Sequence, residues 1–297
     1  MYPEIIRIGD FVISSYGLMM VIAFLVGNYW LRSDLAKCNY SSDVADEITF
    51  RAAIGGIIGA KLYYLIENIP SGIASKNISG LVEIFIGIFT INLEKIAFGI
   101  QNFGAGMVFL GGFIGGFISV YMYVRSKGLK FLQISDLVAP FVVLGHSIGR
   151  IGCFLVGDDY GRPTNLPWGV KFSNGLPISN AGNLRQILGE ESKFIDSGVA
   201  NNVVLACHPT QLYEMILYLF IFLYLKFFIA KKPSYDGRIL FEYLFLASFV
   251  RLMVEFIRLN RPYIFGLSGA QLISIILILV SSIFMWNSRK LNSSFKN

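Results

Sequence analysis

The stretch that decides the fold is 134–156, ISDLVAPFVVLGHSIGRIGCFLV, which leads directly into GDDYGRPTNLPWGV at 157–170. The first part is almost wholly apolar and long enough to cross the ~30 Å hydrocarbon core of a bilayer. Arg150 stands inside it, and Asp158 and Asp159 follow its end. A charge at such depth is costly and usually faces a bundle interior, an aqueous cavity or an anion. The stretch therefore predicts a membrane helix that ends in a polar site.

The composition of the whole chain predicts an integral membrane protein. Of 297 residues, 55% are hydrophobic and only 15% are charged, with a mean hydropathy of +0.61, whereas soluble domains carry about 25% charged residues. The net charge of +6 is explained by basic residues at cytoplasmic helix ends, so we expect no nucleic-acid partner. The three cysteines lack the spacing of zinc or redox motifs, so we expect no metal and no other cofactor.

Hydropathy predicts an all-α polytopic fold with about seven transmembrane helices in a single transmembrane domain, 1–297. A weaker apolar stretch at 81–100 is interrupted by Asn92, Glu94 and Lys95, so we interpret it as a surface-lying or re-entrant segment rather than an eighth span. The predicted spans cover 13–31, 50–67, 104–124, 134–156, 211–230, 238–258 and 266–286.

Basic residues predict the orientation of these helices. Four clusters lie between spans one and two, three and four, five and six, and after span seven, so seven spans place all four on one side, which is the cytoplasmic side by the positive-inside rule. The N-terminus is then outside, the C-terminus is cytoplasmic, and 157–208 forms an extracytoplasmic loop or head between spans four and five. The clusters are Arg32, Lys37 and Arg51; Arg125, Lys127 and Lys130; Lys231, Lys232 and Arg238; and Arg289, Lys290 and Lys296.

Arginines at the outer helix ends are the strongest candidates for a binding site. Arg251, Glu255 and Arg258 are spaced i, i+4, i+7 and therefore share one helix face, where Glu255 can hold one arginine while the other binds a ligand. The planar fork of Arg150 suits phosphate better than any other side chain does. The alternatives are structural: an ion-paired helix end for Arg251 and Arg258, and a salt bridge from Arg150 to Glu255 or Asp158.

Other polar features belong to the same predicted outer face. Gly111 and Gly112 stand in a small-residue pattern typical of close helix packing, but their backbone N–H groups also suit a phosphate. Lys61 lies inside span two and can extend its amine towards the outer face. His208 opens the segment HPTQLYE directly before span five; a lone histidine is usually structural, yet this one lies on the face of the arginines.

Three motifs resemble one family, the bacterial phosphatidylglycerol–prolipoprotein diacylglyceryl transferases. GRIGCFLVGDDYGRPTNLPWGV at 149–170 resembles that family's signature, Gly-Arg-(Ile/Leu)-Gly-Asn-Phe-x-x-Gly-Glu-x-(Tyr/Trp)-Gly-Arg-Pro-Thr. HPTQLYE at 208–214 and RLMVEFIR at 251–258 are similar to its second and third motifs. Weaker similarity, in family order from the first span to the last, is found in SYGLM at 15–19, GAKLYY at 59–64, LGGFIGG at 110–116 and GAQLIS at 269–274.

The resemblance implies a reaction and a location. The family moves the diacylglyceryl group of phosphatidylglycerol to the thiol of the lipobox cysteine in prolipoprotein signal peptides, forms a thioether and releases glycerol phosphate. This implies a multi-pass enzyme of the bacterial cytoplasmic (inner) membrane, with its active site towards the periplasm and with phosphatidylglycerol, prolipoproteins and the bilayer as partners. The expected catalytic residues are Tyr16, Arg150, His208, Arg251 and Glu255. The expected lipid-phosphate residues are Arg150, Arg251, Arg258, Lys61, Gly111, Gly112 and Gly161, supported by Asp158 and Arg162.

The sequence departs from the family pattern at three positions. Cys153 replaces the signature asparagine, Asp158 replaces a glutamate, and Leu110 stands where many members have a histidine. Leu110 cannot accept the thiol proton, which leaves two routes: His208 as a base, or the field of the arginines acting on the thiol pKa. Asp158 is expected to be a poorer base because arginines stand beside it.

Other functions weighed against this are an inactive relative that binds lipid without chemistry, an anion transporter and an intramembrane protease. A transporter typically has internal repeats and charges near the bilayer midplane, and the sequence shows no convincing repeat. The protease motifs Gly-x-Gly-Asp and His-Glu-x-x-His are absent from the sequence.

Overall fold

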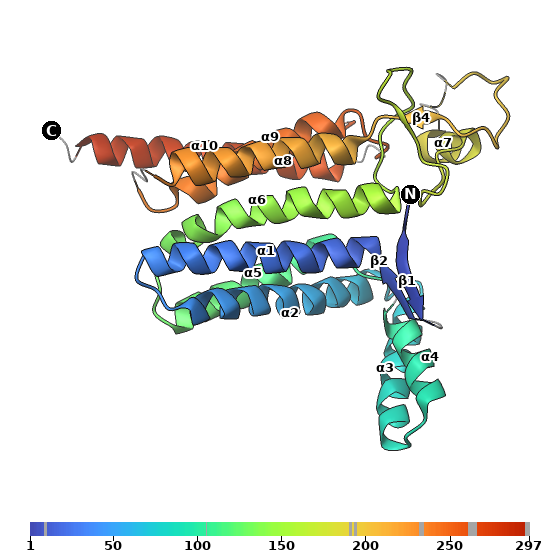
Figure 1. Cartoon of the computed structure of the whole chain (residues 1–297), viewed down its shortest axis with the longest axis horizontal. Helices are drawn as coiled ribbons and strands as arrows, with labels where there is room; N and C mark the ends of the chain where they lie inside the picture. The colour runs from blue at the N-terminus through green and yellow to red at the C-terminus, as the bar shows by residue number, and fades with distance from the viewer. Residues whose placement is uncertain are drawn as a thin grey trace. The chain divides into compact units, whose positions relative to one another are not determined.

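The computed structural model describes residues 1–8, 11–104, 106–189, 192, 195–231, 235–260 and 266–294. The chain is mostly helical and forms two compact units, one made of Met1–Asp34 with Leu132–Asn297 and the other of Leu35–Phe131 (Figure 1). Lys232 and Lys296, counted above among the basic clusters, lie outside the described residues, as do 190, 191, 193 and 194 of the predicted head.

The first unit is a bundle of long helices that run along one direction in Figure 1. It begins with an antiparallel hairpin that the sequence did not predict. The elements of this unit are β1 (Glu4–Ile8), β2 (Phe11–Ser14), α1 (Ser15–Lys37), α6 (Phe131–Val156), β3 (Val170–Lys171), α7 (Ala181–Leu188), β4 (Ala206–Cys207), α8 (Thr210–Tyr224) with a π-helical turn at Leu225–Ile229, α9 (Arg238–Glu255) and α10 (Gly269–Ser294).

Asp136 of α6 joins two helices of this bundle. Its carboxylate accepts hydrogen bonds from the backbone N–H groups of Gly237 (2.7 Å) and Leu240 (2.9 Å), which belong to the first turn of α9. The first N–H groups of a helix have no partner within the helix, and a carboxylate there also complements the helix dipole. Asp136 therefore caps α9 from a neighbouring helix and holds the ends of α6 and α9 together.

The second unit consists of two helix pairs. α2 (Ser42–Glu67) packs against α5 (Phe109–Ser126), and α3 (Ile73–Phe89) packs against α4 (Leu93–Gly104). Glycines let α2 and α5 touch through their backbones: a Cβ on Gly59 would collide with Gly111 and Gly115, and a Cβ on Gly111 would collide with Tyr63. Small residues at such contacts are typical of membrane helix pairs. The packing predicted for these glycines is confirmed.

The weak apolar stretch at 81–100 folds as part of the hairpin of α3 and α4 rather than as one long helix. Thr90 and Ile91 end α3, and Ile91 has a left-handed backbone with φ 52. The two helices contain 17 and 12 residues, which is less than the roughly 20 needed to span a bilayer. In Figure 1 they lie side by side, across the direction of α2 and α5. The interpretation of 81–100 as a surface-lying or re-entrant segment stays a prediction.

All seven predicted stretches are helices, but their bounds differ. α2 begins at Ser42, eight residues before the predicted start at 50, because the Ser41 side chain accepts the N–H of Asp43 (3.2 Å) and caps a polar first turn that hydropathy ignores. Among the described residues, four helices are long and apolar enough to cross a membrane by length and composition. These are Ser15–Lys37, Phe131–Val156, Thr210–Ile229 and Gly269–Ser288. Seven crossings, and the orientation, stay predictions.

The segment between α6 and α8 builds a small core of its own. Tyr160 stacks on Phe172, with ring centroids 4.7 Å apart, and Phe172 is fully buried. One short strand pair, β3 with β4, and isolated β-bridges complete this head, and its buried residues are Tyr160, Phe172, Ala181, Leu184, Ile195 and Cys207. The head is therefore an ordered subdomain attached to the ends of α6 and α8 rather than an extended loop.

Candidate functional site

Glu214, a residue that the sequence analysis did not select, is the centre of the charged site. Its side chain is fully buried on α8, and its carboxylate lies 2.7 Å from Arg150 Nε and 3.0 Å from Arg251 Nη1. Arg258 Nη1 lies 3.6 Å from the same carboxylate. Three arginines from two helices and the segment after α9 thus converge on one buried anion.

Two further carboxylates complete the cluster. Asp159 lies 2.9 Å from Arg150 Nη1 and also pairs with Arg258. Glu255 lies 3.0 Å from Arg251 Nη2 and 3.7 Å from Arg258 Nε. The partner that the sequence suggested for Arg150, Glu255 or Asp158, is wrong, because Arg150 pairs with Glu214 and Asp159 instead. Within this cluster three positive and three negative charges balance, so burial leaves little net charge.

Close backbone contacts bring the helices of the site together. Gly152 lies against Tyr16 at the start of α1, and a Cβ on Gly152 would lie 3.0 Å from the Tyr16 Cα. Tyr16 is 38% exposed, and it lies within the electrostatic range of Arg150 and of the two aspartates. The structure therefore places the predicted residue Tyr16 beside Arg150.

Gly161 is the point where three chain segments cross. Its N–H donates to the His208 carbonyl (2.8 Å), and the next residue, Arg162, donates its N–H to the Ile257 carbonyl (2.8 Å). A Cβ on Gly161 would lie 2.6 Å from that carbonyl and 2.9 Å from Thr210 Cγ2. The role that the structure supports for Gly161 is close packing behind Arg258, rather than a direct hydrogen bond to a phosphate.

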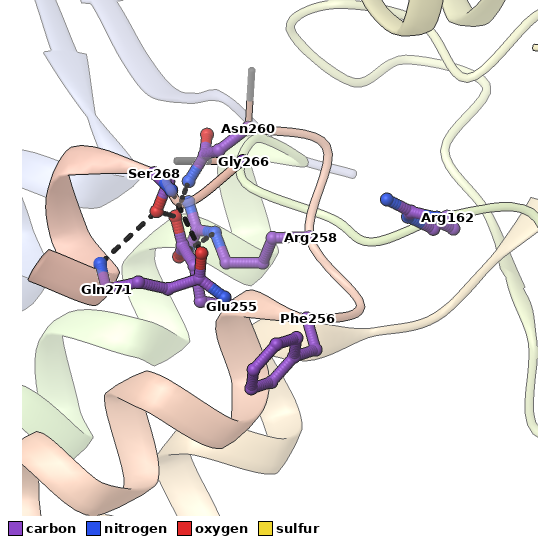
Figure 2. Close-up of a pocket in the computed structure, with 8 residues that line it drawn as sticks. All are labelled: Arg162, Glu255, Phe256, Arg258, Asn260, Gly266, Ser268 and Gln271. Atoms are coloured by element: carbon purple, nitrogen blue, oxygen red, sulfur yellow. Dashed lines mark hydrogen bonds and ion pairs between the residues drawn. The ribbon is translucent and has the colours of Figure 1, made fainter. Parts of the chain in front are cut away.

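A polar cavity of about 90 Å³ opens beside Glu255 and Arg258. Ser268 donates from its hydroxyl to Glu255 (2.6 Å), and Asn260 donates from its side-chain amide to the same carboxylate (2.6 Å). In Figure 2 Arg162 stands across the cavity from this group. The lining residues are Arg162, Glu255, Phe256, Arg258, Asn260, Gly266, Ser268 and Gln271.

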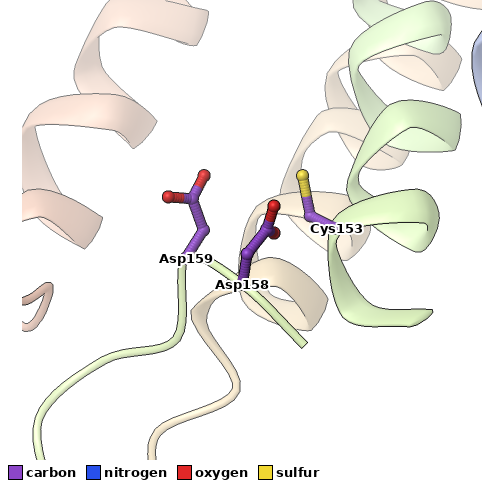
Figure 3. A group of neighbouring side chains, drawn as sticks. All are labelled: Cys153, Asp158 and Asp159. Atoms are coloured by element: carbon purple, nitrogen blue, oxygen red, sulfur yellow. The ribbon is translucent and has the colours of Figure 1, made fainter. Parts of the chain in front are cut away.

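Asp158 and Asp159 are neighbours in sequence but have different environments (Figure 3). Burial opposes the charge of Asp159, yet Arg258 and Arg150 outweigh it and lower the pKa of this carboxyl. Burial, with the nearby charge of Asp159, raises the pKa of Asp158 to about 6. The expectation that arginines make Asp158 a poor base is therefore wrong, because the arginines pair with Asp159.

Cys153 faces the two aspartates, and its sulfur and one oxygen of each carboxylate lie within 4.8 Å of one another. Such a group has ligand types that bind a divalent metal. However, Arg150 and Arg258 both pair with the Asp159 carboxylate. A metal cation would stand beside two guanidinium charges, so the arrangement suits an anion better than a metal.

His208 is tied to an aromatic pair. Trp168 Nε1 donates to the Tyr213 hydroxyl (2.8 Å), and Tyr213 lies 3.2 Å from His208 Nδ1. An indole nitrogen only donates, so the Tyr213 oxygen accepts from Trp168, while the direction of the bond between Tyr213 and His208 Nδ1 follows the His208 tautomer. Burial also lowers the pKa of His208. The Tyr213 hydroxyl therefore engages Nδ1 of His208, and this contact does not involve the second ring nitrogen, Nε2.

Three predicted phosphate residues belong to the second unit. The Lys61 amine donates to the Asn77 side-chain oxygen and to the Phe103 carbonyl, and so joins α2 to the hairpin of α3 and α4. The N–H of Gly112 donates to the Val108 carbonyl (3.1 Å). The N–H group that was proposed to bind a phosphate is therefore already hydrogen-bonded within the helix. The role of Lys61, Gly111 and Gly112 in phosphate binding stays a prediction.

Gln211 is a second residue that sequence reasoning missed. It is fully buried on α8, and its side-chain amide donates to the Asp158 carbonyl. Thr210 donates from its hydroxyl to the Asp159 carbonyl (2.6 Å). Both residues belong to HPTQLYE, as does Glu214. This motif was selected for His208 alone, although a buried arginine group requires a nearby carboxylate and the motif ends in one.

The chain belongs to the prolipoprotein diacylglyceryl transferase family. The sequence model of that family matches residues 3–287. A phosphatidylglycerol–prolipoprotein diacylglyceryl transferase of Clostridium tetani is 32% identical over 97% of this chain and 97% of its own. The corresponding proteins of Fusobacterium nucleatum and Finegoldia magna are 30% and 29% identical, over 98% and 93% of this chain and 99% and 91% of their own. The resemblance expected from the three motifs is confirmed.

Proposed function

We propose that this protein transfers the diacylglyceryl group of phosphatidylglycerol to the lipobox cysteine of prolipoproteins. The observation that carries the proposal is the convergence of Arg150, Arg251 and Arg258 at the end of apolar helices, in a member of this family. A fork of guanidinium donors matches the oxygens of a phosphate. The enzyme is further proposed to lie in the bacterial inner membrane with this site on the periplasmic side.

A lipid phosphate has to replace a carboxylate, because the arginines are already paired. Glu214 and Glu255 have side chains 0% and 1% exposed, whereas the Asp159 side chain is 41% exposed. Asp159 bridges Arg150 and Arg258. We infer that the phosphate takes the position of Asp159, since this carboxylate can turn towards water while the other two remain as fixed counter-charges.

The reaction forms a carbon–sulfur bond and breaks a carbon–oxygen bond. The thiolate sulfur attacks the terminal glycerol carbon of the diacylglyceryl group, and the electron pair of the C–O bond leaves with glycerol phosphate. Negative charge grows on the phosphate oxygen as the bond breaks. Preorganised donors at that oxygen stabilise the transition state, which is the role we propose for Arg150 and Arg251. Tyr16 stands beside Arg150 at the start of α1, where we propose that it orients the substrate.

Mass spectrometry of a lipobox peptide tests the function. The purified protein is incubated with the peptide and with vesicles of phosphatidylglycerol, and the expected product carries one diacylglyceryl group on the cysteine. Vesicles of phosphatidylethanolamine serve as the control, and a peptide with serine in place of the cysteine shows that the thiol reacts. Phosphatidylglycerol that binds without any product would instead indicate an inactive lipid-binding relative, the alternative that Leu110 and Cys153 suggest.

A further inference from the structure

The substrate thiol must lose its proton to a base, and the arginines of the cluster cannot be that base. The attacking species is the thiolate, yet a cysteine with a pKa near ~8.5 is mostly protonated at neutral pH. Arg150, Arg251 and Arg258 carry protons permanently and cannot act as bases. Leu110 has no proton chemistry, and Tyr213 occupies a nitrogen of His208.

We propose that Asp158 is the general base that takes the proton from the prolipoprotein thiol. The proposal rests on the function proposed above and adds a catalytic residue to it. Among the described residues, Asp158 Oδ1 is a buried oxygen with no nitrogen or hydroxyl donor, and the carboxyl group interacts only with the Cys153 thiol as a side-chain hydrogen-bond partner. The carboxylate lies in the same cluster as Asp159, the residue whose place the lipid phosphate takes (Figure 3). We infer that this Asp158 oxygen, beside the position of the lipid phosphate, accepts the proton of the prolipoprotein thiol.

The backbone holds Asp158 in this position. Its carbonyl accepts from the buried Gln211 side chain, and its N–H donates to the Cys153 carbonyl (3.2 Å). Gly157, with φ 75, and Asp159, with φ 59, both have left-handed backbones. These turns on either side of Asp158 allow the two adjacent carboxylates to face different partners. Asp159 faces the arginines, and Asp158 is left outside the ion pairs.

Burial keeps Asp158 basic near neutral pH, against the arginines that lower its pKa. It faces Asp159 on its own segment, Cys153 and Arg150 from α6, and Arg258 from the segment after α9. Tyr16 faces it from α1. Burial raises its pKa to about 6, and the neighbouring Asp159 adds to the shift. A base with a pKa just below the working pH is both unprotonated and able to hold a proton, which is the favourable case for general-base catalysis.

The proposed step conserves atoms and charge. The thiol proton moves to Asp158, the sulfur electron pair forms the thioether bond, and the C–O electron pair leaves with glycerol phosphate. The departing phosphate gains a second negative charge, and phosphate monoesters have a second pKa near ~6. The proton on Asp158 therefore passes to the departing phosphate or to water, and the carboxylate is restored for the next cycle.

The experiment compares Asp158→Asn with Asp158→Glu, using lipobox peptides that carry cysteine or selenocysteine. With the cysteine peptide, Asp158→Asn is expected to lose at least ~100-fold in rate at pH 7 and to regain part of it at pH 9, where the thiol ionises unaided. A selenol is already ionised at pH 7, so with the selenocysteine peptide Asp158→Asn is expected to approach the wild-type rate. Asp158→Glu keeps a carboxylate and is expected to stay active with both peptides.

The pH profile gives a second measurement. The wild-type rate should level off above pH about 6, because Asp158 is then unprotonated and accepts the thiol proton. The rate of Asp158→Asn should instead keep rising with pH towards the thiol pKa near ~8.5, whereas His208→Gln should level off as the wild type does. An Asp158→Asn variant that is equally slow with selenocysteine, or whose rate levels off above pH 6 as the wild-type rate does, would overturn the assignment of Asp158 as base. A wild-type protein that forms no thioether with either peptide would overturn the proposed function itself.

Discussion

Replacing Glu214 by glutamine perturbs the most buried charge of the site. The substitution keeps the shape of the side chain but removes the negative charge that Arg150 and Arg251 approach to 2.7 and 3.0 Å. The new amide group also turns two hydrogens towards guanidinium donors. Breaking a buried ion pair on one side costs about 3–5 kcal/mol, and in a large domain 1 kcal/mol shifts the unfolding midpoint by about 2–4 °C. We therefore expect the apparent midpoint in detergent to fall by about 6–20 °C.

Phosphatidylglycerol should restore part of this loss. The variant leaves three arginines with two carboxylates, so an anionic phosphate fills the missing charge. A ligand at 100 times its Kd stabilises by about 2.7 kcal/mol, which corresponds to about 5–11 °C on the same scale. The shift caused by phosphatidylglycerol should be larger in Glu214→Gln than in the wild type. Activity should fall on the order of 100-fold, because displaced arginines no longer hold the phosphate in line.

Glu242→Gln is the matched control for this experiment. Glu242 is a second poorly exposed glutamate of the bundle, but it pairs with one arginine, Arg238, at 2.9 Å. Its loss should lower the midpoint less, and phosphatidylglycerol should shift that variant and the wild type equally. If Glu214→Gln unfolded within about 2 °C of the wild type and responded to phosphatidylglycerol as the wild type does, the central role of Glu214 would be refuted.

Three further predictions concern the arginine fork, the helix packing and the orientation. Arg150→Lys should slow diacylglyceryl transfer by about 100- to 1000-fold, measured with the lipobox peptide, because one ammonium group cannot replace a fork that holds two carboxylates. Gly59→Ala should lower the thermal midpoint by forcing α2 and α5 apart, at about 1–3 kcal/mol, whereas Gly269→Ala has no atom within 4 Å of the new Cβ and should leave it unchanged. In intact cells, a cysteine at Ser197 should react with a membrane-impermeant maleimide and one at Asp236 should not; the reverse pattern would contradict the predicted orientation.

Helices were the part of the fold that the sequence predicted best, because long apolar runs are required wherever a chain crosses a membrane. Their ends were less predictable, since capping depends on single polar residues. Ser41 starts α2 within a charged segment, and Asp136 caps α9 from another helix. No local pattern shows that a residue of α6 will cap a helix that begins about 100 positions later. The β1–β2 hairpin was missed for a related reason, since two strands of five and four residues are too short for a clear alternation.

The arginines of the site were predictable because a cation in an apolar stretch is costly unless it binds an anion or faces a polar cavity. Their partners were not, because pairing depends on how α6, α8 and α9 pack. Glu214 follows Tyr213 at the end of a motif whose histidine attracted attention, and only the packing shows that it faces Arg150 and Arg251. A charge count alone would have helped: three arginines were assigned to the outer face with one fixed carboxylate, Glu255, and burial requires the remaining charges to be balanced.

The two adjacent aspartates differ in a way that cannot be predicted from the sequence. Asp158 and Asp159 have the same side chain and are adjacent in the chain, so residue type alone assigns them the same pKa. In the structure, Arg150 and Arg258 pair with Asp159 and lower its pKa, while burial raises the pKa of Asp158 to about 6. The left-handed turn at Asp159 lets the two carboxylates diverge. One aspartate can therefore serve as a displaceable counter-ion and the other as a base, and this division of roles depends on the backbone turn and the packed arginines, not on residue type.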